Sequence, residues 1–257
     1  MKKGRNLRSV NTDGGVNLQF KLLSAIGIII IVSGHCYHGG MELAYNWFPP
    51  YSYNLALFVF ISGYFYKTDY EENIGKYIWK RTKRLLIPAY LWNIFYGGMV
   101  AFLGLFGFTI GAKPDLYNLF VMPFVDGEAF QYNLGSWFVY PLFLVCIINV
   151  LFRKFLKLIH LDNEFIVLIV YLAIGMIGIN TAIGNPTAIN GIVKLLVRTM
   201  FFLPCYEFGR FYKAVLEKKD TLNNVAYFAI IFAVQLILLT FCKDLEYTPS
   251  SFTKFNN

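Results

Sequence analysis

The sequence predicts an all-α integral membrane protein: a multi-pass bundle of about seven transmembrane helices with a cytoplasmic N-terminus. Of its 257 residues, 57% are hydrophobic and 15% are charged, whereas soluble domains have about 45–50% apolar and about 25% charged residues. The apolar residues form long blocks rather than a one-sided stripe, which is typical of helices surrounded by lipid. Both observations exclude a single soluble domain.

The third observation is the distribution of positive charge. A net charge of +8 is compatible with nucleic-acid binding, but the position of the basic residues decides against it. Most of them lie in every second gap between the apolar blocks, at residues 2–21, 67–84, 153–157 and 210–219. Cytoplasmic loops of membrane proteins are enriched in Lys and Arg in this way. We therefore expect a chain in contact with membrane lipids and no nucleic-acid partner.

The chain divides into a polar cytoplasmic tail (1–17), a transmembrane region (18–242) and a short polar tail (243–257). The second block (53–66) is short for a hydrocarbon core of about 30 Å, so its ends are expected either to be buried against neighbours or to extend into the flanking tyrosines. Pro88 is expected to open the third span, because a missing N–H costs nothing in the first helical turn. The expected spans are residues 22–35, 53–66, 85–110, 134–152, 165–179, 192–211 and 224–241.

The four cysteines are scattered through the apolar blocks without CxxC spacing. A disulfide framework or a zinc site would need such spacing or an extracellular, cysteine-rich domain. We expect no metal site and no permanently bound cofactor.

His35 ends the first apolar block and is the first candidate catalytic residue. At about 1.5 Å per residue from Lys21, it lies roughly 21 Å into a core of about 30 Å. An ionisable side chain at such depth indicates function, and imidazole suits proton transfer near neutral pH. The alternative is an interfacial histidine that hydrogen-bonds a backbone carbonyl.

Arg81 and Arg84 stand three residues apart in a basic cluster at the start of the third block. On a helix, this spacing points both guanidinium groups to one side, and paired guanidinium groups suit bidentate binding of phosphate oxygens. The alternative is a cluster that only fixes topology and contacts anionic lipid.

The sixth block is unusual because it holds Lys194, Arg198, Pro204 and Glu207. Lys194 and Arg198 share one helix face, and Arg198 lies roughly 9 Å below the outer edge of the core. We expect Arg198 to face His35 across a polar cavity, where it steadies an oxyanion or holds an acceptor. The alternative is that both cations reach to the outer interface. Glu207 and Arg210 are expected to form a local ion pair.

Trp137 opens the fourth block at its outer end. Aromatic belts at membrane interfaces account for most tryptophans in such positions. The alternative is stacking against a sugar ring, which makes Trp137 a candidate substrate-binding residue together with Arg198.

Several short motifs occur in a fixed order along the chain. They are a histidine closing the first block, FVFISGY (Phe58–Tyr64), RxxR running into LLIPAY (Arg81–Tyr90), SWFV (Ser136–Val139) and FFLPCYEFGRFY (Phe201–Tyr212). In this order the chain resembles the acyltransferase-3 family of membrane O-acyltransferases, which modify bacterial surface polysaccharides, peptidoglycan and related acceptors. The resemblance covers residues 18–212.

The resemblance implies a role for each matching residue. His35 corresponds to the family's essential histidine, and Arg81 and Arg84 correspond to its paired arginines near the acyl-CoA site. It implies acetyl-CoA, or another acyl-CoA, as co-substrate and a hydroxyl of a cell-surface saccharide, or of its lipid-linked precursor, as acceptor. It also implies a multi-pass protein of the bacterial plasma membrane.

The chain departs from the family pattern at two places. Family members often carry a basic residue eleven positions before the histidine, where Ser24 stands here, with Lys21 one turn earlier. They also usually continue for further spans beyond the position of Asn257. The second departure leaves an inactive truncated remnant as an alternative. A rival function class is a transporter or channel in which His35, Lys194 and Arg198 line a polar pathway.

Overall fold

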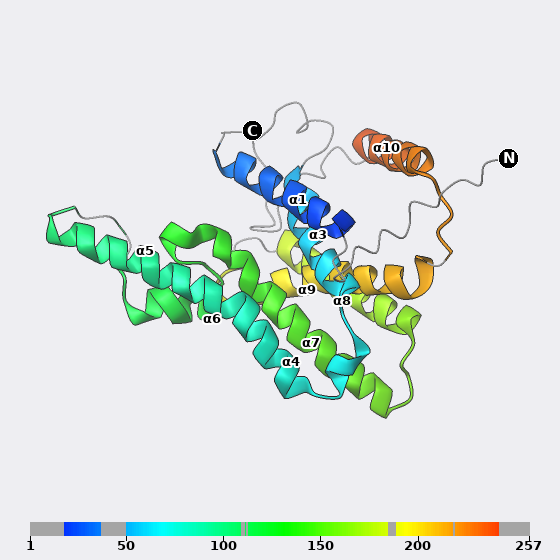
Figure 1. Ribbon diagram of the computed structural model, residues 1–257, viewed down its shortest axis with the longest axis horizontal. Coiled ribbons are helices and arrows are strands. Elements are labelled where there is room, and N and C mark those ends of the chain that lie inside the picture. Colours follow the sequence, from blue (N-terminus) through cyan, green and yellow to red (C-terminus); the bar gives the residue numbers. More distant parts are fainter. Residues whose placement is uncertain are drawn as a thin grey trace.

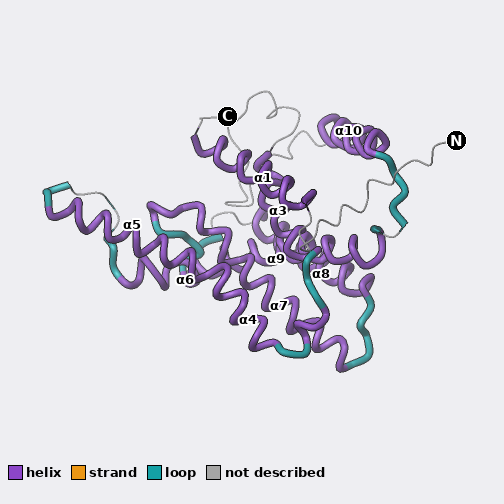
Figure 2. The backbone as a smooth tube through the Cα atoms, in the orientation of Figure 1, coloured by secondary structure: helices purple, strands orange, loops and turns teal. Residues whose placement is uncertain are grey.

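The computed structural model describes residues 18–36, 50–108, 111, 113–184, 189–217 and 219–241, and every regular element in these ranges is helical (Figures 1 and 2). This confirms the predicted all-α class. Each expected span coincides with one long helix: α1 (Leu18–Cys36), α3 (Pro50–Tyr64), α5 (Ile87–Leu105), α7 (Val139–Leu158), α8 (Glu164–Gly184), α9 (Gly191–Phe211) and α10 (Asn224–Phe241).

Shorter helical segments join these helices or extend them. Two have 3₁₀ geometry, η1 (Thr68–Glu71) and η4 (Gln131–Phe138), and two are short α-helices, α4 (Ile74–Arg81) and α6 (Met122–Val125). Single wide π-turns form the rest, namely η2 (Thr82–Leu86), η3 (Tyr117–Val121) and η6 (Tyr212–Leu216).

Three helical segments of the described chain are long and apolar enough to cross a membrane: Ile74–Leu105, Gln131–Leu158 and Glu164–Gly184. Three further helices are apolar over shorter stretches, at Gln19–Val32, Asn54–Tyr64 and Val225–Val234. The chain is thus a helical membrane protein, while the count of seven spans and the side of the N-terminus stay predictions.

Helix α9 lies at the centre of the fold and packs against α3, α7 and α8 (Figure 1). Glycines permit the close approach of α3 and α9. A Cβ atom on Gly63 would collide with the Tyr206 carbonyl, and one on Gly209 would collide with the Phe60 carbonyl. Small residues allow such backbone contact between helices in membranes.

The central position of α9 explains how a helix with several charges is accommodated. Arg198, Glu207 and Arg210 are all buried, although the sequence of α9 carries too many charges to count as an independent apolar span. Charged side chains in membrane helices face the bundle interior, because lipid offers them no partners. The helix α5, in contrast, exposes a row of apolar side chains suited to lipid contact: Leu91, Trp92, Ile94, Phe95, Met99 and Phe102.

Pro88 lies in the first turn of α5, as expected, but the helix itself begins earlier. A single helical rod runs from Ile74 to Leu105 through α4, η2 and α5, and α7 packs against α4 and η2 (Figure 1). Pro88 has no N–H to donate and its ring crowds the preceding turn. The helix passes the proline through a wide turn, in which the Ile87 N–H donates to the Thr82 carbonyl. The basic cluster is therefore fixed to α5 by continuous helix.

Candidate functional site

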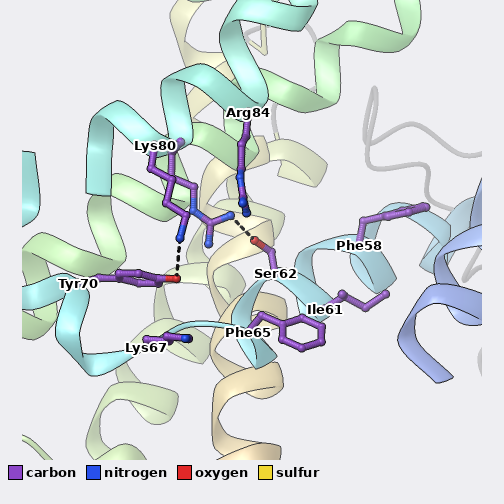
Figure 3. A pocket seen from close by; sticks show the side chains of 9 residues that line it. Phe58, Ile61, Ser62, Phe65, Lys67, Tyr70, Lys80 and Arg84 are labelled. Atoms are coloured by element: carbon purple, nitrogen blue, oxygen red, sulfur yellow. Dashed lines mark hydrogen bonds between the residues drawn. The ribbon is translucent and has the colours of Figure 1, made fainter. Parts of the chain in front are cut away.

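A cavity of about 450 Å³ lies between α3 and the basic helix of α4 and η2 (Figure 3). One side is cationic and the other is apolar and comes from α3; no lining residue is acidic. Nine residues line it: Phe58, Ile61, Ser62, Phe65, Lys67, Tyr70, Lys80, Arg81 and Arg84.

The structure brings Arg81 and Arg84 to this one cavity, as their spacing of three residues predicts. Arg81 is half-buried and connects the two walls, whereas Arg84 is exposed. The Nε of Arg81 donates to the Tyr77 hydroxyl at 3.1 Å, and an Nη donates to the Ser62 Oγ at 3.3 Å. Hydroxyl partners orient the guanidinium and leave its charge in place.

Two further cations in the cavity, Lys67 and Lys80, were missed by the sequence analysis. The Lys80 Nζ donates to the Tyr70 hydroxyl at 3.3 Å and lies 5.1 Å from the centroid of its ring (Figure 3). Lys80 directly precedes Arg81 in the basic cluster, which is a signal that the sequence contains. Tyr70 lies on η1, and no motif in the sequence links it to the cluster.

His35 lies in the last turn of α1, and its side chain falls outside the described residues. Contacts of α1 nevertheless fix its direction. The ring of Phe20 lies 4.3 Å from that of Tyr64, while a Cβ on Gly27 would approach the Phe58 ring at 2.9 Å. Helices α1 and α3 are therefore antiparallel. The backbone of His35 lies roughly 12 Å beyond Phe58 along α1, at about 1.5 Å per residue.

Arg198 and Trp137, the two candidate acceptor residues, lie in contact. The Cζ of Arg198 is 4.3 Å from the centroid of the Trp137 ring, and Arg198 donates to the Gly127 carbonyl. Arg198 is 3% exposed, so it is turned into the bundle and does not reach to the interface, whereas Lys194 pairs with the half-exposed Glu128. Because the His35 side chain falls outside the described residues, the polar cavity expected between Arg198 and His35 stays a prediction.

The expected ion pair of Glu207 with Arg210 is replaced by longer-range pairs. Glu207 pairs with Arg153 of α7 at 2.5 Å. Arg210 pairs with Glu164 of α8 at 2.8 Å and with Glu71 of η1 at 3.5 Å. The spacing of three residues between Glu207 and Arg210 indicates only that both lie on one face of α9. In the fold, Arg153 of α7 and Glu164 of α8 pair with these two side chains. This network ties η1 to the bundle.

No group of three or more His, Cys, Asp and Glu side chains suited to a metal ion occurs in the described residues.

Comparison with known protein families gives one informative result. A family model described as an acyltransferase domain matches residues 17–252. Comparison with curated proteins and with solved structures gives no match. The family match extends past the last motif, which ends at Tyr212, and includes α10.

Proposed function

The chain belongs to the acyltransferase-3 family, and we propose that it transfers an acyl group, specifically acetyl, from acyl-CoA to a hydroxyl of a cell-surface saccharide or its lipid-linked precursor. The family establishes acyl transfer in general. The donor, the acceptor and the acetyl group belong to the proposal.

The single observation that carries the proposal is the cavity in which Arg81 and Arg84 lie with two lysines and no acidic residue. Acyl-CoA combines a phosphorylated nucleotide with a thin acyl-bearing arm. The cations suit its phosphates, and the apolar wall of Phe58, Ile61 and Phe65 suits the arm. Because α1 packs on α3 at Phe58, an arm that follows this wall leads toward His35.

In the proposed reaction, the acceptor hydroxyl oxygen attacks the thioester carbonyl carbon. The carbon–sulfur bond breaks, the CoA thiolate leaves, and the new ester carries the acyl group. His35 takes the hydroxyl proton and returns it to the thiolate, so that no net proton is released. In the alternative sequence, an imidazole nitrogen of His35 first accepts the acyl group and then passes it to the acceptor.

Arg198 and Trp137 are proposed to bind the acceptor and to stabilise its reaction with the acyl group. An indole ring stacks on the apolar face of a sugar, and a buried guanidinium stabilises the oxyanion that forms at the carbonyl. Their contact supports a joint role, because it places the guanidinium and the indole beside the same space.

The test is transfer of radiolabelled acetyl groups from acetyl-CoA to surface polysaccharide in membranes that contain the native acceptor. Membranes with wild type are compared with His35→Ala, Arg81→Ala and membranes without the protein. Label with wild type, loss in both variants, and CoA binding lost only in Arg81→Ala support the proposal. No label with wild type, or full label with His35→Ala, overturns it.

A further inference from the structure

We infer that Lys80 is a phosphate-binding residue of the donor site, positioned by Tyr70, and that a stacked pair of tyrosines presents Lys80 and Arg81 to the ligand. This inference rests on the proposed function and names which charges of the donor the site recognises. Lys80 lies outside the RxxR motif.

The geometry is a pair of rings with one cation on each. The rings of Tyr70 and Tyr77 stack with centroids 4.6 Å apart and planes 26° apart. Lys80 lies over Tyr70, 5.1 Å from the ring centroid, and Arg81 lies over Tyr77 at the same distance. Each cation also donates to the hydroxyl of its own tyrosine. The two positive groups are held side by side.

Tyrosine holds these cations without neutralising them. A phenol hydroxyl and a ring face attract a cation, but neither carries the negative charge of a carboxylate. Several other cations of the described chain are paired with carboxylates instead, as in Arg153–Glu207, Arg210–Glu164 and Lys194–Glu128. The cations of the cavity are therefore not neutralised by the described part of the protein, and their positive charge can bind an anionic ligand.

The number of cations fits a ligand with several phosphates. Lys67, Lys80, Arg81 and Arg84 give the cavity four positive charges, and no lining residue is acidic. The 3′-phosphate and the diphosphate of CoA together carry roughly four negative charges near neutral pH. A ligand with a single phosphate, such as phosphopantetheine or a simple lipid headgroup, leaves part of this charge unmatched.

The tyrosine pair is held in place by contacts of η1 with the bundle. Glu71, the neighbour of Tyr70, is buried, accepts from the Tyr66 hydroxyl at 3.3 Å and pairs with Arg210 at 3.5 Å. Lys80 is thereby preorganised through η1, and preorganisation lowers the entropy lost when the ligand binds.

The experiment measures binding of CoA, 3′-dephospho-CoA and phosphopantetheine to the purified full-length protein in a neutral detergent. The variants are Lys80→Gln and Lys80→Arg. The matched control is Lys83→Gln, which removes the same charge from the same helix. The Lys83 ammonium lies 5.0 Å from the Trp79 ring centroid and does not line the cavity.

Lys80→Gln is expected to weaken CoA binding about tenfold and phosphopantetheine binding by a smaller factor. Lys80→Arg restores most of the affinity, and Lys83→Gln changes it less than about twofold. Tyr70→Phe, which keeps the ring and loses the hydroxyl, weakens CoA binding in the wild-type background and has no further effect with Lys80→Gln. If Lys80 had only a structural role, Lys80→Gln would weaken the binding of CoA and of phosphopantetheine by the same factor, and the ratio of the two affinities would not change.

Equal effects of Lys80→Gln and Lys83→Gln overturn the inference and leave the proposed function intact, provided that Arg81→Ala still abolishes CoA binding. The same holds if Lys80→Gln lowers only the amount of anionic lipid that the protein retains. Absence of CoA binding by wild type, with the protein folded by circular dichroism, overturns both the inference and the proposed donor.

Discussion

The guanidinium of Arg198 lies against the indole of Trp137, with 4.3 Å between the Arg198 Cζ and the ring centroid. The two side chains come from α9 and from η4, and the sequence suggests each of them separately as an acceptor residue. A buried positive charge needs compensation inside a membrane bundle. The ring face and the Gly127 carbonyl supply it.

We expect Trp137→Leu to destabilise the protein by about 2 kcal/mol through the loss of a desolvated cation–π contact, beyond the effect of the smaller side chain. The measurement is the unfolding midpoint of the purified protein in detergent. Trp79→Leu is the matched control, because Trp79 also carries a cation, Lys83, but is 55% exposed. Exposed pairs of this kind contribute about 0.5–1 kcal/mol. Equal midpoint shifts for the two variants would contradict the prediction.

A second prediction concerns the buried pair of Arg153 and Glu207. Both side chains are 0% exposed and their charged atoms are 2.5 Å apart. Arg153→Met leaves Glu207 buried without this partner, and breaking such a pair costs about 3–5 kcal/mol. We expect a large fall in the unfolding midpoint, measured by denaturant titration in detergent.

The double variant Arg153→Met/Glu207→Leu tests the cause of that fall. It removes both charges, so it is expected to recover much of the lost stability. The exposed pair gives the comparison: Lys194→Met is expected to cost less than about 1 kcal/mol, because Glu128 is 48% exposed and stays hydrated. A double variant as unstable as Arg153→Met would show that the unpaired charge of Glu207 does not explain the loss, since Glu164 also loses its contact with Arg153 at 2.7 Å.

The positions of the helices follow from the sequence because hydropathy is a local property. Every expected span contains a helix, and the spacing of Arg81 and Arg84 already places both on one side of that helix. Pro88 lies at the start of α5 as expected, but the sequence did not predict that the helix continues into α5 from η2 by widening one turn. That adjustment depends on neighbouring packing and has no local signal.

The partners of charged residues were harder to predict. Glu207 meets Arg153, which lies 54 residues away in the sequence, and Lys80 depends on Tyr70 of η1. Such contacts arise only after α7, α8 and η1 are packed around α9. Charge spacing along one helix predicts a shared face, and the fold then selects the partner.

The last prediction concerns the glycine contact between α3 and α9. Gly63→Ala places a Cβ against the Tyr206 carbonyl, and neither backbone can yield without separating the helices. Overpacking costs typically about 1–3 kcal/mol, and because Ser62 binds Arg81, a shift of α3 also disturbs the cavity. We therefore expect lower stability and weaker CoA binding, measured by unfolding midpoint and equilibrium binding.

Gly98→Ala on α5 is the control for this substitution. A Cβ on Gly98 has no neighbour within 4 Å, and replacing a helical glycine by alanine contributes roughly 0.5–1 kcal/mol of helix stability. We expect this variant to be as stable as wild type or more stable, with unchanged CoA binding. If Gly63→Ala behaved in the same way, α3 and α9 would not be in backbone contact, and the wall of the cavity formed by α3 would have to lie elsewhere.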